Sequence, residues 1–267
     1  MTAGKGGIHA PGEVVRVLRR RYPAEPQGAA DPFWTLVATV LSQRTREEKT
    51  AEAAKSLFAA YPDASSLASA TAEKVIPLIK PAGFYNQKAP TIIELSRRLV
   101  ADYGGQVPRE MDRLLALPGV GRKTANCVLV YGFGIPAIPV DTHVHRISNR
   151  LSWVRTRTPE ATEAALVACL PKRYWLDINE LFVLFGREIC RPVGPRCPEC
   201  ALTGCPSRGK VKAGRKKGKA YVPGFKSSLL GGLGSALERM PRDLSRGGSV
   251  LRSVRKPRTS VRGERSR

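Results

Sequence analysis

The stretch LPGVGRKTAN, residues 117–126, decides how this chain is organised. A helix-like run, residues 111–116, leads into it, and an apolar run, residues 125–130, follows it. The Leu-Pro pair is predicted to end the first helix, because proline disfavours helical geometry in the residue before it and lacks an N–H. The Gly-Val-Gly segment then permits a sharp turn. A second helix is predicted from about Arg122, and its unpaired N–H groups and positive dipole end would grip a phosphate.

An ordinary Pro-Gly turn between two helices is the alternative, and it is the better interpretation of a lone P-G-x-G. The complete string is far more specific, because it resembles the helix-hairpin-helix of the endonuclease III family of DNA glycosylases, which carry an iron–sulfur cluster. The resemblance implies a DNA-backbone contact made by four consecutive residues, Gly119, Val120, Gly121 and Arg122.

Composition favours a nucleic-acid partner. The 267 residues carry a formal net charge of +23, a field that attracts polyanions, with DNA or RNA as the leading partner and an anionic membrane surface as the alternative. No signal peptide is recognisable at the start, and no apolar run approaches the roughly 20 residues needed to span a bilayer. We therefore expect no membrane association and a cytoplasmic protein, at the nucleoid in a prokaryote, whose six cysteines stay reduced.

The spacing of apolar residues predicts an all-α fold. Helices are expected over residues 12–22, 33–43, 47–61, 72–79, 88–103 and 109–117, and no stretch shows the alternation of a strand. Asp31 and Asp141 are predicted N-caps, and Asp177 with Glu180 suggests a capping box. Residues 209–267 are predicted to be a disordered basic tail, since residues 208–267 hold 18 Lys and Arg against three acidic residues.

Four cysteines near the end of the predicted fold suggest a metal centre. They are Cys190, Cys197, Cys200 and Cys205, with the spacing C-x6-C-x2-C-x4-C. This spacing fits an iron–sulfur cluster better than zinc, which more often uses paired C-x2-C knuckles, but it leaves both open. The family resemblance implies one 4Fe-4S cluster, although the family's last gap is one residue longer.

The resemblance also gives the cysteine loop a role in binding. Arg191 and Arg196 lie in that loop, and in the family the loop presents basic side chains to the DNA backbone. The cluster is therefore expected to be structural. The two other cysteines, Cys127 and Cys169, fall in apolar helices and are interpreted as small core residues.

Two residues are predicted to carry the chemistry. A glycosylase that also cuts the strand needs an amine nucleophile at the sugar C1′, and Lys123 is the candidate. Burial, the neighbouring Arg122 and the helix N-terminus are each expected to lower its pKa. A carboxylate is needed to steady the cationic sugar, and the family places its catalytic aspartate in the VDTHV motif, here at Asp141. The alternative for Lys123 is a phosphate contact without covalent work, and the alternative for Asp141 is a plain N-cap.

A third motif, Leu41-Ser42-Gln43-Arg44, concerns access to the sugar. The target nucleotide must swing out of the duplex, and a side chain must fill the gap that it leaves. In the family a glutamine in the Leu-Ser-x-Gln loop does this, and here the motif is displaced by about one position. Gln43 or Arg44 could therefore be this wedge; Gln43 is favoured, and the alternative is that both contact phosphates.

The resemblance implies two helical domains with a DNA-binding cleft between them. A helical barrel domain with the hairpin is predicted over 28–133, and a discontinuous cluster domain over 12–27 and 134–208. The expected protein is a monomeric DNA glycosylase and AP lyase that acts on double-stranded DNA with an oxidised pyrimidine or an abasic site. The alternatives are a glycosylase for mismatches (thymine or uracil opposite guanine, or adenine) and a non-catalytic DNA-binding module.

Overall fold

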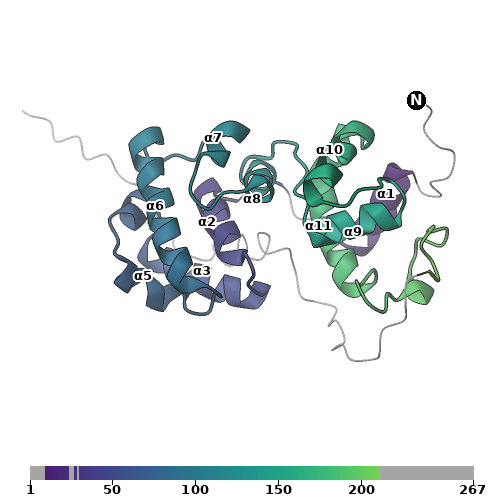
Figure 1. Ribbon diagram of the computed structural model, residues 1–267, viewed down its shortest axis with the longest axis horizontal. Helices are drawn as coiled ribbons and strands as arrows, with labels where there is room; N and C mark the ends of the chain where they lie inside the picture. Colours follow the sequence, from purple (N-terminus) through teal and green to yellow (C-terminus); the bar gives the residue numbers. More distant parts are fainter. Residues whose placement is uncertain (1–9, 24–26, 29, 211–267) are drawn as a thin grey trace, which may run out of the picture.

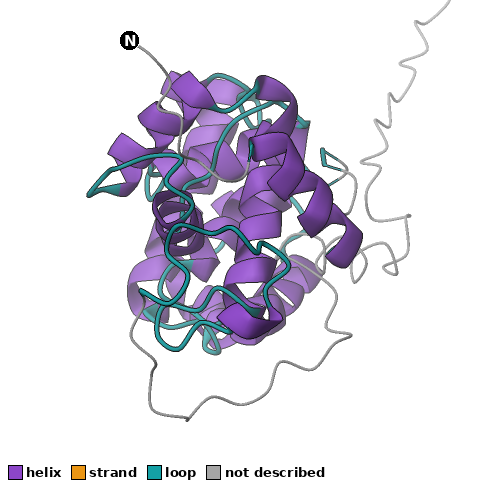
Figure 2. Ribbon diagram, turned by 90° about the vertical axis from the view of Figure 1, so that its right-hand side faces the viewer, coloured by secondary structure: helices purple, strands orange, loops and turns teal. Residues whose placement is uncertain are grey.

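The computed structural model describes residues 10–23, 27–28 and 30–210. The described residues form helices, turns and loops and no strand (Figure 2), as expected for an all-α protein. Within them the helices are α1 (Pro11–Arg21), α2 (Pro32–Ser42), α3 (Glu47–Ala60), α4 (Ala64–Ala68), α5 (Ala72–Ile79), α6 (Tyr85–Tyr103), α7 (Met111–Leu115), α8 (Arg122–Cys127), α9 (Thr142–Arg150), α10 (Pro159–Cys169) and α11 (Trp175–Glu188). A π-helical turn, Val128–Gly132, continues α8, and 3₁₀ turns occupy Lys172–Tyr174 and Cys197–Glu199. The predicted tail lies outside the described residues, apart from 209 and 210.

The helices gather around two separate hydrophobic cores. The first core takes its buried residues from Phe33 to Ala137, and the second from α1 and from Ile138 to Leu202. Figure 1 shows the two groups side by side, with the N-terminal helix α1 among the C-terminal helices α9 to α11 and with α8 between the groups. This change of core at residues 137 and 138 supports the proposed discontinuous division, whose boundaries stay a prediction.

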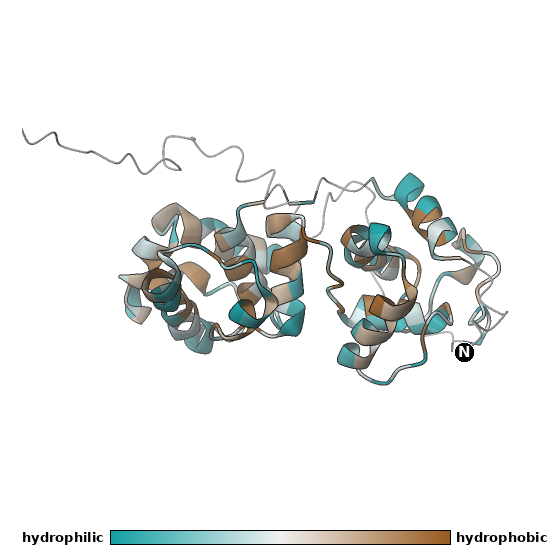
Figure 3. Ribbon diagram, turned by 90° about the horizontal axis from the view of Figure 1, so that it is seen from above, coloured by the Kyte–Doolittle hydropathy of each residue, from teal (hydrophilic) through white to brown (hydrophobic). Residues whose placement is uncertain are grey.

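The core of the first group is built around α2. This helix is apolar on nearly every side and eight of its eleven residues are buried, as a helix surrounded by others requires. Asp31 caps it by accepting a hydrogen bond from the Trp34 N–H at 2.9 Å, and Pro32 occupies the first helical position. Trp34 stacks on Phe58 of α3 with 5.2 Å between ring centroids. Figure 3 shows apolar segments interspersed with polar ones in the helices of both groups.

The predicted capping box at Asp177 is wrong. Helix α11 begins at Trp175, after a 3₁₀ turn, so Asp177 lies inside the first turn and its side chain is free of the cap. The carboxylate instead pairs with Arg19 of α1, accepting hydrogen bonds at 2.6 and 3.2 Å. This contact fixes the N-terminal helix against α11 and could not be predicted locally, because its partners lie 158 residues apart.

No described helix is both long enough and apolar enough to cross a bilayer.

Candidate active site and cysteine centre

The hairpin has the geometry that its sequence predicts. Helix α7 ends before Pro118, the turn passes through Gly119 with a φ of +74°, and α8 starts at Arg122. No side chain caps α8, so the first N–H groups of this helix remain available as hydrogen-bond donors at the turn. The Gln43 side-chain amide reaches the turn and donates to the Gly119 carbonyl oxygen at 3.0 Å.

The two glycines of the turn make a matched pair for mutation. A Cβ on Gly119 would meet the Thr91 methyl carbon at 2.5 Å in a left-handed backbone, whereas one on Gly121 would meet nothing within 4 Å. We expect Gly119→Ala to destabilise the fold by about 1–3 kcal/mol and to weaken DNA binding, because strain and clash add. Thermal unfolding and DNA titration measure both effects. Gly121→Ala is the control, and equal effects from the two variants would contradict this view of the turn.

Lys123 and Asp141 line one open cleft of about 520 Å³ between the two groups of helices. Lys123 lies in the first turn of α8, and Asp141 is the N-cap of α9. One carboxylate oxygen of Asp141, Oδ1, accepts the N–H bonds of His143 and Val144, both at 2.8 Å. The predicted N-cap is therefore confirmed. Its other oxygen, Oδ2, accepts no hydrogen bond from the described residues, so the carboxylate keeps an unused acceptor.

The pKa of Lys123 depends on the charge of Cys127. Its side chain is exposed to the cleft, but the protein encloses the ammonium on most sides. The neighbouring Cys127 raises the pKa most, burial lowers it and Asp141 raises it, with a net increase. Burial also raises the pKa of the Cys127 thiol, so near neutral pH this thiol is uncharged and its upward effect on Lys123 is lost. Of the two other main causes, burial, which lowers the pKa of Lys123, outweighs Asp141, which raises it. Arg122 plays no part, because it pairs with Glu163 of α10 at 2.9 Å.

Further polar groups line the same cleft, and the sequence analysis missed them. The Tyr131 hydroxyl, carried by the π-helical turn, donates to Asn179 Oδ1 at 2.7 Å, and Asn179 donates to the Pro139 carbonyl at 2.7 Å. Glu47 of α3 and Arg187 of α11 also line it and form an ion pair that joins the two groups of helices. Cys127 had a local signal, since it follows Lys123 by four residues on one helix face.

His143 lies at the edge of the cleft in a neutral form. Burial lowers its pKa, Asp141 raises it, and the cations Arg146 and Arg187 lower it, with a net decrease. The Arg146 guanidinium donates to His143 Nδ1 at 3.1 Å, which places the imidazole hydrogen on Nε2. Gly186 leaves the room for this pair, because a Cβ there would meet His143 Nδ1 at 2.3 Å.

The two candidates for the wedge differ in position. Arg44 is exposed, lines the cleft and has a φ of +53°, with its guanidinium 5.7 Å from the Phe84 ring centroid. Gln43 is exposed as well, but its amide is engaged with the hairpin and does not line the cleft. Phe84 is 53% exposed, an aromatic ring beside Arg44 that the sequence analysis did not single out.

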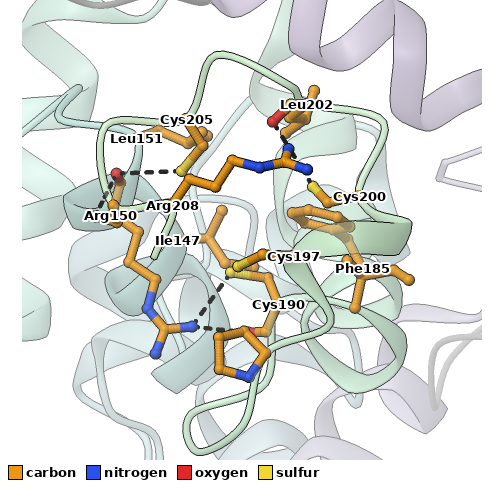
Figure 4. A pocket seen from close by; sticks show the side chains of 13 residues that line it. Ile147, Arg150, Leu151, Phe185, Cys190, Cys197, Cys200, Leu202, Cys205 and Arg208 are labelled. Atoms are coloured by element: carbon orange, nitrogen blue, oxygen red, sulfur yellow. Dashed lines mark hydrogen bonds between the residues drawn. The ribbon is translucent and has the colours of Figure 1, made fainter. Parts of the chain in front are cut away.

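The four predicted cysteine ligands line one small pocket (Figure 4). Arg150 donates to Cys190 Sγ at 3.3 Å and to the Arg191 carbonyl at 2.6 Å, so it ties the loop to α9. No three cysteine, histidine or acidic side chains of the described residues lie close enough to share a single metal ion.

The basic residues of the cysteine loop lie away from the cleft. Arg196 pairs with Glu199 at 3.5 Å, and Arg191 donates to the Arg187 carbonyl at 3.2 Å. Neither lines the cleft that holds Lys123, and their predicted DNA contact stays a prediction. Of the two remaining cysteines, Cys127 is buried as expected, but Cys169 is exposed near the end of α10, because it falls on the outer face of that helix.

Comparison with known proteins agrees with this site. A model of the HhH-GPD superfamily of base excision DNA repair proteins matches residues 37–172, which contain both the hairpin and Asp141. The chain therefore belongs to this superfamily. Within it, the chain is 51% identical over 210 residues to Endonuclease III of Thermotoga maritima, an alignment that covers 79% of this chain and 96% of the relative.

Solved structures give the same result. The chain superposes with a TM-score of 0.68 and 35% identity on a structure titled as a trapped endonuclease III–DNA covalent intermediate, covering 74% of this chain and 94% of the other. A thermostable thymine-DNA glycosylase superposes with a TM-score of 0.63 and 27% identity, again covering 74% of this chain and 94% of the other.

Proposed function

We propose that this chain is a bifunctional DNA glycosylase and AP lyase of base excision repair, which removes oxidised pyrimidines from double-stranded DNA. The observation that carries the proposal is the placement of Lys123 and Asp141 on one cleft between two groups of helices. The relatives named endonuclease III, and the structure in which such an enzyme is trapped covalently on DNA, support the same activity.

The proposed chemistry needs the amine of Lys123 without its proton; burial lowers the pKa of this amine and Asp141 raises it. The oxygen of Asp141 that caps no N–H group lines the same cleft and is the proposed acceptor of the proton. The nitrogen then forms a bond to C1′ while the C1′–base bond breaks and the base leaves with its electron pair and a proton. Asp141 stabilises the positive charge that develops on the sugar.

Strand cleavage follows after the sugar ring opens: the electron pair of the bonded nitrogen forms the C=N bond of the Schiff base, the C1′–O4′ bond breaks, and O4′ takes up a proton. The positively charged imine acidifies the C2′ proton, a base removes it, and the electron pair expels the 3′ phosphate in a β-elimination. Hydrolysis of the remaining imine releases Lys123. One residue thereby serves both the glycosylase and the lyase step, and this is the meaning of bifunctional here.

The four cysteines are proposed to hold one 4Fe-4S cluster. The pocket fits this group because it gathers four thiols, the usual ligands of such a cluster, among side chains that are apolar apart from Arg150, Ser207 and Arg208. The cluster would tie the loop after α11 to α9 and so stabilise the fold. Metal analysis of the purified protein distinguishes the two possibilities, and we expect it to find iron and no zinc. A cytoplasmic location remains a prediction.

The wedge is proposed to be Arg44, in place of Gln43. Its position on the cleft and beside an exposed aromatic ring supports this choice, whereas the Gln43 amide is bonded to the hairpin. A long cationic side chain can enter a vacated stack and remain near the surrounding phosphates.

A panel of duplexes, each with one defined lesion, tests the proposed function. Single-turnover reactions should release oxidised pyrimidines and break the strand at the same site without added alkali. Cleavage confined to thymine or uracil opposite guanine would favour the mismatch alternative. The similarity to a thymine-DNA glycosylase supports that alternative. Base release without strand cleavage would exclude the lyase activity, and DNA binding without either reaction would leave a non-catalytic module.

A further inference from the structure

Lys88 is a buried lysine that the proposed chemistry leaves without a role. It lies in the first turn of α6, within the stretch Gly83-Phe84-Tyr85-Asn86-Gln87-Lys88-Ala89, and only 7% of its surface is exposed. Lysine is among the residues least often buried, and burial without partners is costly. A buried ammonium is therefore expected to have hydrogen-bond partners and a structural or functional role.

All three hydrogens of this ammonium are used. Nζ donates to the Leu41 carbonyl at 2.6 Å, to the Gln43 carbonyl at 2.7 Å and to the Thr45 hydroxyl at 2.8 Å. Burial lowers its pKa to about 8, so the side chain is still mainly a three-donor cation at neutral pH. These acceptors follow the C-terminal end of α2, where a positive charge is also favoured by the helix dipole.

The three bonds enclose Arg44 on both sides. Arg44 has a φ of +53°, a left-handed backbone that is unfavourable for a non-glycine residue and persists only where its surroundings enforce it. Two of the three oxygens that Lys88 binds belong to the residues immediately before and after it, Gln43 and Thr45. Thr45 is fixed further by the Gly83 N–H, which donates to its hydroxyl at 3.1 Å.

The result of this clamp is the orientation of a side chain at the active-site cleft. Arg44 lines the cleft together with Lys123 and Asp141, although Lys88 itself does not. We propose that Lys88 is a positioning residue, whose ammonium fixes the Gln43–Thr45 backbone so that Arg44 enters the space of the everted nucleotide. This inference rests on the proposed function, and its test separates the two.

Single-stranded DNA supplies the contrast. An abasic site in a single strand has no opposing stack, so a wedge is not needed to expose its sugar, but the attack by Lys123 is still required. A variant with a loose wedge loop should therefore lose activity on duplex DNA and keep it on the single strand. A variant that is merely destabilised should lose both in equal measure.

The test variant is Lys88→Met, which keeps the length of the side chain and removes its donors. We expect single-turnover removal of an oxidised pyrimidine from a duplex to fall about tenfold or more, as when only a tenth of the molecules hold the loop correctly. Borohydride trapping on a single-stranded abasic site should change less than about threefold. Lys55→Met, which removes an exposed lysine on α3, is the charge control and should leave both rates unchanged.

Thr45→Val keeps the test decisive if Lys88→Met does not fold. It removes one of the three acceptors with little change of shape, and we expect a smaller loss in the same direction, again confined to the duplex. Equal losses on both substrates, or no loss on either, would overturn the role of Lys88. A wild-type protein that traps on neither substrate would instead overturn the proposed function.

Discussion

Replacing Lys123 by alanine is expected to abolish the adduct that borohydride traps between this protein and abasic-site DNA. The amine is the only atom of this side chain that can bond to C1′, so base removal should fall by at least about a thousandfold. DNA affinity should stay within about tenfold, because phosphate contacts supply most of it. Trapping on a denaturing gel and DNA titration measure the two quantities.

The outcome of this substitution separates the leading account from its main alternative. If Lys123→Ala still traps efficiently, the nucleophile lies elsewhere in the chain. If affinity falls as steeply as activity, Lys123 is a phosphate contact. Lys55→Met serves again as the control, since it removes an exposed lysine outside the cleft.

The second large effect is expected for Asp141→Asn. Asparagine caps helices as well as aspartate does, so the helix start should survive and the stability should change by less than about 1 kcal/mol. The charge is lost, and base removal should slow by about a hundredfold or more because nothing then steadies the cationic sugar or takes the proton. Single-turnover kinetics and thermal unfolding of the same preparation measure both.

The same variant has a second consequence that a plain N-cap would not produce. Asp141 raises the pKa of Lys123, so its neutralisation should lower that pKa and leave more free amine at neutral pH. Trapping at a preformed abasic site should therefore suffer less than base removal does. Equal rates for Asp141→Asn and the wild type in base removal would show that Asp141 only caps α9.

The hairpin and the helix caps could be predicted because each is contained in a few consecutive residues. The LPGVGRKTAN stretch holds its helix stop, its turn and its helix start within ten residues. Asp141 caps the N–H groups of His143 and Val144, two and three residues further on. The four cysteines are similarly local, and their spacing placed them around one cavity.

The electrostatics of the site could not be predicted in this way. A lowered pKa for Lys123 followed from its neighbours in sequence, but Arg122 turns away to Glu163, and the groups that act on the ammonium are Cys127 and Asp141. The capping box failed for a related reason, because Asp177 found a partner in α1 instead of in its own helix. Local patterns fix backbone geometry, whereas charge pairing depends on what the fold brings close.

Contacts across long sequence distances account for the remaining omissions. Glu47 and Arg187 meet across the cleft from positions 140 residues apart, and Lys88 reaches the loop before α3 from more than 40 residues away. No spacing rule connects such pairs. The stretch that holds Lys88, residues 83–89, does not contain any of the three acceptors that surround its ammonium.

The most direct test of the account is to locate the covalent bond. Wild-type protein is incubated with abasic-site duplex and borohydride, the adduct is digested, and the modified peptide is sequenced by mass spectrometry. The account predicts that the deoxyribose remnant is attached to Lys123 Nζ, within the peptide that contains residues 122–127. Attachment to any other residue, or the absence of an adduct from an active preparation, would contradict it.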